Sequence, residues 1–114
     1  MATITLPDEL AKRVEPFSRW LPTVLEISLL ALKTPAIKTA SEIVEFLTSN
    51  PSPREVHAYH VSKHAQVRMK RLLALNRAGV LGEAEARELD ELISLEHLII
   101  TLKANLVPED TAAA

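Results

Sequence analysis

Three histidines, His57, His60 and His64, are the residues whose types and spacing come closest to a site with ligand chemistry. On one continuous helix, their spacings of three and seven residues would place the imidazoles on one face. Neutral imidazoles in that arrangement bind zinc or nickel, as in a metal carrier or metalloenzyme. No nearby acid or cysteine completes a site of the usual kind, and a helix break is expected near Ser62. We therefore treat the three as weak metal candidates and favour ordinary surface or partly packed histidines.

Charged residues form a second group with chemical potential. Residues 54–77 contain six Lys or Arg against one acid, whereas residues 83–96 contain six acids against one base. A basic face on the first segment could contact phosphates. We favour instead a solvated face that pairs with the acids of the following segment. The members of this basic face are Lys63, Arg68, Lys70 and Arg71.

The acids Glu85, Glu88 and Glu91 recur at spacings of three, as a carboxylate site on one helix face would require. Neither a histidine, a glycine-rich loop nor a second acid cluster accompanies them. We interpret them as an exposed acidic helix end, which the positive N-terminal end of a helix dipole favours.

Other common routes to catalysis are missing from the sequence. It has no cysteine and only two glycines, and it contains no nucleophile elbow, phosphate loop, dinucleotide fingerprint or HExxH motif. We therefore predict no catalytic residues, no cofactor, no small-molecule substrate and no enzymatic activity. The net charge of −2 gives no global argument for nucleic acid, and no signal-like or membrane-spanning apolar run is present. These features favour a cytoplasmic protein.

The elements that carry these residues are predicted to be mostly helical. Residues 3–6 alternate polar and apolar types and predict a short strand, after which Pro7 begins a helix that Pro16 kinks or ends. A second helix is predicted from Pro22 to about Lys33. It is apolar around most of its circumference, so a second copy or another partner should cover part of it.

The remaining helices are marked by capping signals. Thr34 is a candidate N-cap for a third helix, and Ser52 with Glu55 matches the capping box that begins the next one. This helix should break near 61–62 and end before Gly79. The segment 79–82 is a tight connection to a long final helix over about 83–105.

The predicted fold class is therefore all-α, mainly helical with a short N-terminal β-strand. It has about five helices and a C-terminal antiparallel helical hairpin. We divide the chain into a dimerisation part (1–50), a partner-binding hairpin (51–107) and a tail (108–114). The residues assigned to the dimer or partner interface are Ile4, Leu6, Leu25, Ile27, Leu29 and Leu30.

The opening residues Thr3-Ile4-Thr5-Leu6-Pro7-Asp8-Glu9-Leu10, followed by Ala11 to Val14, resemble the start of ribbon-helix-helix proteins. In that family, the strands of two subunits pair and read the major groove of DNA. The resemblance implies that Thr3 and Thr5 face DNA, whereas Ile4 and Leu6 face the dimer core. Many members are antitoxins whose C-terminal part wraps a toxin.

The second half, from Arg71-Leu72-Leu73-Ala74-Leu75 through Glu83-Ala84-Glu85 to Leu92, is similar to a helical hairpin of uncharacterised small bacterial proteins of cyanobacterial type. Together the two resemblances imply an antitoxin-like, non-catalytic homodimer that binds a partner protein, such as a toxin, and operator DNA. The alternative is a helical accessory or assembly subunit of a larger protein complex with no nucleic-acid role.

Overall fold

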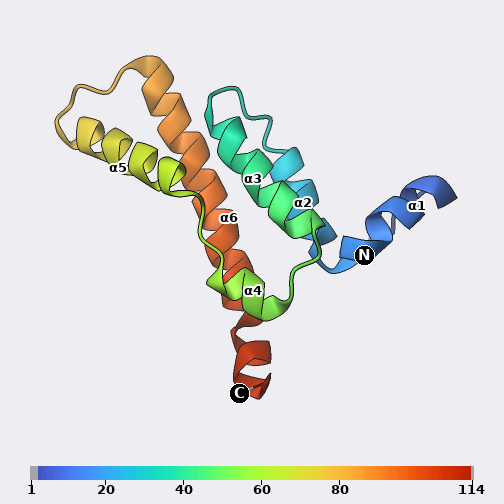
Figure 1. Ribbon diagram of the computed structural model, residues 1–114. Coiled ribbons are helices and arrows are strands. Elements are labelled where there is room, and N and C mark those ends of the chain that lie inside the picture. Colours follow the sequence, from blue (N-terminus) through green and yellow to red (C-terminus); the bar gives the residue numbers. More distant parts are fainter. Residues whose placement is uncertain (1–2, 114) are drawn as a thin grey trace.

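The computed structural model describes the backbone of residues 3–113 and the side chains of residues 3–106. Helices dominate this part of the chain, which confirms the mainly helical prediction. Figure 1 shows a body of packed helices from which α1 projects at one side. The elements are α1 (Asp8–Val14), the 3₁₀ segment η1 (Glu15–Trp20), α2 (Leu21–Ser28), α3 (Ala36–Thr48), α4 (Pro53–Ala58), α5 (Lys63–Arg77) and α6 (Glu83–Ala113).

The predicted N-terminal strand is not found: residues 3–7 have no regular secondary structure, and the described residues contain no strand. The physical reason is pairing. The backbone N–H and C=O groups of a strand need a neighbouring strand as partner, and the described part of one chain offers none.

Proline and the backbone set the ends of the first elements. Acids lie in the first turn of α1 and bases in its last turn, as the helix dipole favours. Pro16 then occupies the first turn of η1. α2 ends at Ser28 rather than at the predicted Lys33, and Ala31 takes a left-handed conformation (φ 52°). A residue with positive φ cannot continue a right-handed helix, so the predicted second helix was too long.

The predicted N-cap of the third helix, Thr34, lies one residue before the N-cap position, which is Pro35, although the Ala36 N–H does donate to Thr34 Oγ1. The capping signal of the fourth helix was correct. Asn50 has a positive φ of 58° and separates α3 from α4. At the start of α4, the Glu55 N–H donates to Ser52 Oγ (3.1 Å) and the Ser52 N–H donates to Glu55 Oε1 (2.9 Å). This confirms the predicted capping box.

The predicted break also occurs, because α4 ends at Ala58 and α5 begins at Lys63. Ser62 caps α5 by accepting from the Ala65 N–H (3.2 Å). Glu42 of α3 holds this cap in place, since its carboxylate accepts from both the N–H (3.1 Å) and the Oγ (3.0 Å) of Ser62. A contact between residues far apart in the sequence therefore fixes where the helix restarts.

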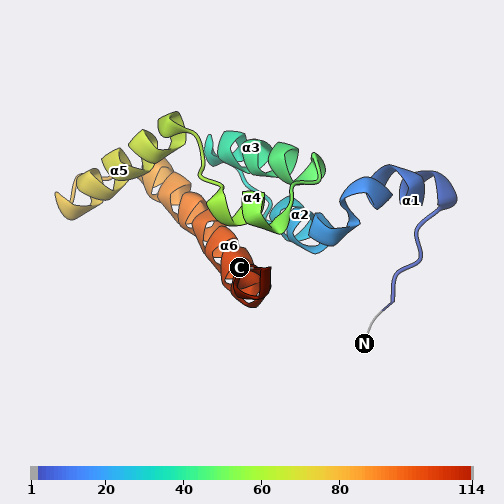
Figure 2. The same ribbon diagram turned by 60° about the horizontal axis from the view of Figure 1, so that its bottom comes forward.

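The chain reverses between α5 and α6, with Gly79 at a φ of 73° just after the end of α5. Figures 1 and 2 show that these two arms of the hairpin cross obliquely rather than lying parallel along their length. α6 continues to Ala113, past the predicted end near Asn105. None of the described helices is long and apolar enough to cross a bilayer.

The core joins both halves of the chain. Trp20 is 2% exposed and its indole N–H donates to the Pro51 carbonyl (2.9 Å). The main cluster brings the end of η1 and helices α2, α3 and α4 together with residues 95–106 of α6; its buried members are Trp20, Val24, Ile27, Ala40, Ile43, Leu47, Val56, Leu95 and Leu106. A smaller cluster lies where α5, α6 and the start of α3 meet, and it contains Ala36, Leu72, Leu89 and Leu92.

Candidate interaction surfaces

The N-terminal segment is the least covered part of the described chain. α1 has no buried residue, and its packing contacts are chiefly with η1. Thr3 and Thr5 are exposed, Ile4 is 80% exposed and Leu6 is half-buried. Figure 2 shows this segment and α1 extending away from the body. We call residues 3–14 the N-terminal arm.

The apolar residues assigned to an interface in α2 and in the turn that follows it divide into two groups. Ile27 is only 4% exposed and belongs to the core, and Leu30 packs against that core. In contrast, Leu25 is 49% and Leu29 is 82% exposed. The chain therefore hides one side of the segment by itself and leaves the other side uncovered.

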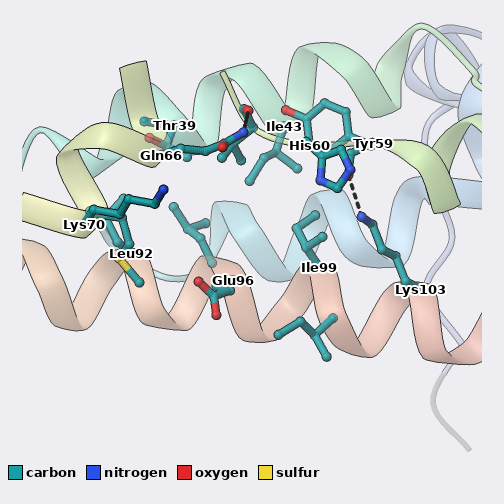
Figure 3. A pocket seen from close by; sticks show the side chains of 15 residues that line it. Thr39, Ile43, Tyr59, His60, Gln66, Lys70, Leu92, Glu96, Ile99 and Lys103 are labelled. Atoms are coloured by element: carbon teal, nitrogen blue, oxygen red, sulfur yellow. Dashed lines mark hydrogen bonds between the residues drawn. The ribbon is translucent and has the colours of Figure 1, made fainter. Parts of the chain in front are cut away.

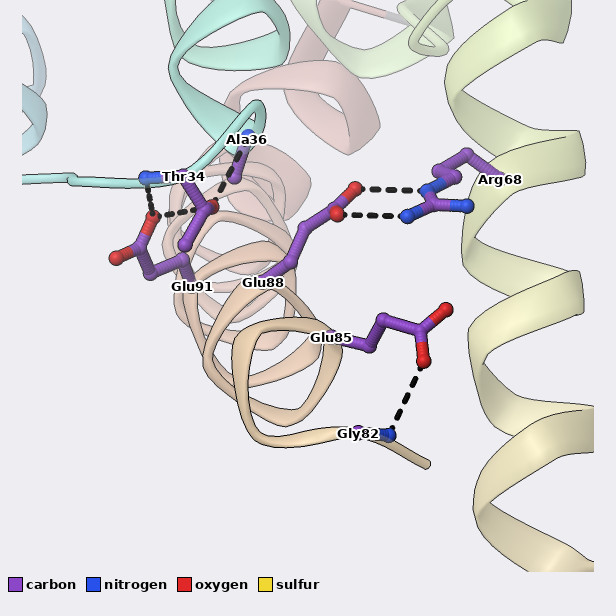
Figure 4. Close-up of polar contacts among 7 residues, drawn as sticks. All are labelled: Thr34, Ala36, Arg68, Gly82, Glu85, Glu88 and Glu91. Carbon is purple, nitrogen blue, oxygen red and sulfur yellow. Dashed lines mark hydrogen bonds and ion pairs between the residues drawn. The ribbon is translucent and has the colours of Figure 1, made fainter. Parts of the chain in front are cut away.

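One residue of the basic face forms an ion pair within the hairpin, and the other three are exposed. Lys63, Lys70 and Arg71 are exposed, but Arg68 forms a two-pronged ion pair with Glu88 of α6 (Figure 4). Its Nε and Nη2 donate to the two carboxylate oxygens at 2.9 and 2.8 Å. The expected pairing between the basic and acidic helices is therefore confirmed at this position.

The prediction that Glu85, Glu88 and Glu91 form an exposed acidic helix end is wrong for Glu88, because its side chain is only 4% exposed. The hydrogen bonds from Arg68 hold the pKa of Glu88 below its usual value, against the opposing effect of burial. A buried carboxylate needs such a partner, since an unpaired one would be strongly disfavoured.

Glu91 also has a specific structural role. Its carboxylate accepts from the Lys33 N–H (3.0 Å) and from the Oγ1 of Thr34 (2.6 Å), and Thr34 Oγ1 in turn accepts from the Ala36 N–H (3.1 Å). Burial raises the pKa of Glu91, but the hydrogen bonds from Thr34 and Lys33 outweigh it and leave the pKa lowered. Glu85 accepts from the Gly82 N–H (3.1 Å), so each of the three acids stabilises a different junction (Figure 4).

The structure does not assemble the three histidines into a metal site. The helix break separates His57 on α4 from His64 on α5 and leaves His60 in the linker, and all three side chains are exposed. No group of three potential metal-ligating acids or histidines occurs among the described residues. The continuous helix that the metal hypothesis required is absent between residues 58 and 63.

A groove of about 390 Å³ lies between α3, residues 59–70 (the linker from α4 and the first part of α5), and α6 (Figure 3). Its apolar walls include Ile43, Leu95, Ile99 and Ile100. Leu95 and Ile43 are each 1% exposed, whereas Ile100 is 55% exposed. We call this feature the α3–α6 groove. Its size falls in the range of pockets that enclose ligands or side chains of a partner.

Polar groups surround the apolar surface of the α3–α6 groove. Figure 3 shows Glu96 along the middle of the groove, with Lys70 toward one end and Lys103 toward the other. The Lys103 ammonium donates to the Tyr59 carbonyl, and the Tyr59 ring stacks on Phe46 with centroids 4.2 Å apart. Burial, with a smaller effect of Glu42, raises the pKa of Tyr59.

Sequence reasoning did not find this groove, because its walls come from three segments that are far apart in the chain. The one available signal was the excess of apolar positions in the final helix, where Ile99 and Ile100 follow each other. Helical periodicity alone does not show which of these residues a neighbouring element leaves uncovered.

Comparison with known proteins gave no match to a family model, to a curated protein or to a solved structure.

Proposed function

We propose that this chain is a non-catalytic, antitoxin-like binding protein that forms a homodimer through its N-terminal region and engages a protein partner with its α5–α6 hairpin. The observation that carries the proposal is the exposure of large apolar side chains on the arm and at the C-terminal end of α2. Ile4 is 80% and Leu29 82% exposed, and Leu25 is half exposed. Leu25 and Leu29 are four residues apart, at the C-terminal end of α2, and adjacent exposed apolar residues mark interaction sites.

The free energies of burial and association indicate that a stable dimer must bury more apolar surface than the α2 region supplies. Covering one fully exposed leucine contributes about 1.5–3 kcal/mol; because Leu25 is 49% and Leu29 82% exposed, these residues of two copies would contribute roughly 4–8 kcal/mol. Association itself costs about 4–15 kcal/mol. The two figures are close, so stable pairing needs the additional apolar surface that the N-terminal arm provides.

The hairpin supplies a second exposed surface for the partner. Val67 on α5 is 57% exposed, Val80 in the connection 64% and Ile93 on α6 46%. Val80 lies within the segment from Arg71 to Leu92 whose sequence resembles the hairpin of small bacterial proteins, and Val67 and Ile93 lie just outside its two ends. The proposal therefore assigns self-association and partner binding to different ends of the molecule.

Sedimentation of the full chain at micromolar concentration tests the dimer. The wild type should sediment as a dimer, and Leu29→Glu should shift it to monomer because a carboxylate would have to be buried at the contact. Val67→Glu, an equally drastic change at an exposed valine of the hairpin, is the matched control and should leave the dimer intact. A wild type that remains monomeric would refute the proposal.

Operator DNA is the second ligand of the proposal. Support comes from the exposed positions of Thr3 and Thr5, which lie on a segment without regular secondary structure. A strand in this segment would need a second chain as its pairing partner. A gel shift at low salt with the flanking promoter should show binding by the wild type, and the double variant Thr3→Ala, Thr5→Ala should bind more weakly. Absence of any shift by the wild type would remove DNA from the function.

A further inference from the structure

We infer that the solvent-facing side of α5 binds an acidic helix of the partner protein. The inference rests on the proposed partner binding by the hairpin and names the chemistry of that partner. Three observations carry it: the charges of α5, the hydrogen bonds that occupy acids of α6, and the spacing of the exposed residues. This side of the helix, which we call the outer face of α5, consists of the exposed residues Lys63, Val67, Lys70, Arg71, Ala74 and Arg77.

The outer face carries positive charge that nothing on its own helix offsets. Residues 63–77 contain five Lys or Arg and no Asp or Glu. Arg68 is used within the chain, because its guanidinium is ion-paired with Glu88. The other four bases are exposed, and their side chains form no ion pair or hydrogen bond with the described residues. Like charges on one side of a helix repel one another and attract a partner of opposite charge.

The neighbouring helix does not neutralise this face, although its N-terminal half is acidic. Glu88 is buried in its ion pair with Arg68, and Glu91 accepts hydrogen bonds from two backbone N–H groups just before α3. Glu85 accepts from the Gly82 N–H at the start of its own helix. Figure 4 shows these carboxylates directed at their partners. The negative charge that would complement the outer face must therefore come from another molecule.

The spacing of the outer face fits a second helix. Lys63, Lys70 and Arg77 are seven residues apart, so they form a row along α5 over about 21 Å. Val67 and Ala74, also seven apart, form a shorter apolar row beside them, and Val67 is 57% exposed. Apolar residues at this repeat, flanked by charges, are the pattern by which two helices pack side by side, and the flanking charges select the partner. The pattern predicts a partner helix with apolar residues over the short row and carboxylates opposite the bases.

The same apolar row favours a protein over a nucleic acid. Contacts to phosphates are made by hydrogen-bond donors, such as Lys, Arg, Ser, Thr and Asn side chains. Val67 and Ala74 offer no side-chain donor, yet they lie in the middle of the outer face, with bases on both sides. An apolar centre with a charged rim is the usual arrangement of a contact between proteins. The outer face therefore fits an acidic helix rather than a phosphate backbone.

Nuclear magnetic resonance titration of the full chain, labelled with nitrogen-15, tests the assignment at low salt. The probe is a synthetic peptide of about three heptads with leucine and glutamate at the complementary positions, and the reference peptide has lysine in place of each glutamate. The acidic peptide should shift the amide signals of α5 more than those of α3, and added salt should weaken its binding. The reference peptide should leave the signals of α5 unshifted.

Two double variants with the same change in net charge provide the comparison. Lys70→Glu with Arg71→Glu reverses two charges of the outer face and should weaken peptide binding at least roughly tenfold. Lys38→Glu with Arg54→Glu is the matched control and should bind the peptide as the wild type does. Both control positions are exposed and lie in the first turns of α3 and α4, where the helix dipole favours a carboxylate. The spectrum of each variant without peptide shows whether the fold is retained.

Each of four results would overturn the assignment. Unshifted α5 signals with the acidic peptide, or undiminished binding by Lys70→Glu with Arg71→Glu, would remove an acidic helix as the ligand. Larger shifts of α5 with random-sequence duplex DNA of equal charge would assign the face to nucleic acid. Conversion of the same double variant from dimer to monomer in sedimentation would assign it to self-association.

The oligomeric state separates this inference from the proposed function. If the wild type sediments as a dimer and the acidic peptide does not bind, only the chemistry assigned to the partner fails. A monomeric wild type would refute the proposed homodimer whatever the peptide does, because α5 lies outside the region to which dimerisation is assigned.

Discussion

The role of Glu88 in the structure differs from the one that its sequence pattern suggests. In the sequence it is one of three regularly spaced acids, but in the fold it is almost completely buried and held by both donors of the Arg68 fork. A two-pronged ion pair of this kind constrains orientation as well as energy. It links the two arms of the hairpin at a defined position.

Removing the charge of Glu88 should therefore destabilise the chain. Glu88→Gln leaves Arg68 without its ionic partner, and we expect a loss of about 1–3 kcal/mol in the free energy of unfolding. The half-exposed Arg68 retains access to water, which keeps the loss below that of a fully buried pair. Urea unfolding measures the change, with Arg71→Met at an exposed site as control; an equal effect of both variants would contradict the structural role of the pair.

The same residue predicts an acid-sensitive stability. Because the pKa of Glu88 is lower in the folded chain than its ordinary value of 4.5, the unfolded chain binds more protons in acid. The stabilisation is fully present above about pH 4.5 and is lost as the pH falls through the lowered pKa. Unfolding free energies measured from pH 6 down to about pH 3 should therefore fall less steeply for Glu88→Gln than for the wild type.

At the scale of the elements, the helix starts follow from local chemistry. Ser52 and Glu55 form the predicted capping box because both partners lie within one turn of the chain. Replacing Ser52 with Ala should cost about 1 kcal/mol of stability. Ser41→Ala, at an exposed position within α3, is the control and should have little effect; thermal unfolding followed by circular dichroism compares them.

The elements that could not be predicted depend on distant residues. α2 ends shortly before Ala31, which has a left-handed backbone conformation. An alanine in the sequence does not indicate such a conformation. The restart of α5 is fixed by Glu42, twenty positions away from Ser62. The groove likewise needs the placement of α3 against α6, and the periodicity of either helix carries no information about the other.

The exposed side of α2 was predictable for a different reason. The apolar residues of this segment surround the helix, so one short chain could cover only part of them. In the structure, the covered part includes Ile27, which is buried in the core, whereas Leu29 remains exposed. Sequence alone indicated an excess of apolar surface but not the residues that carry it.

For the molecule as a whole, the main core combines the first fifty residues with the hairpin half. Trp20 and Ile43 pack in the same cluster as Val56 and Leu95. Such a shared core predicts a single cooperative unfolding transition, as is usual for small domains. Urea titrations followed by far-ultraviolet circular dichroism and by intrinsic fluorescence should have the same midpoint, and two separate midpoints would contradict a shared core.

The burial of Trp20 has a practical consequence for such measurements. It is the one tryptophan of the sequence, and it connects η1 to the Pro51 carbonyl inside the body. Its emission should thus be shifted to short wavelengths in the native chain and to long wavelengths once solvent reaches the indole. The molecule carries a built-in optical reporter whose signal follows the interior and is insensitive to events at the tip of the arm.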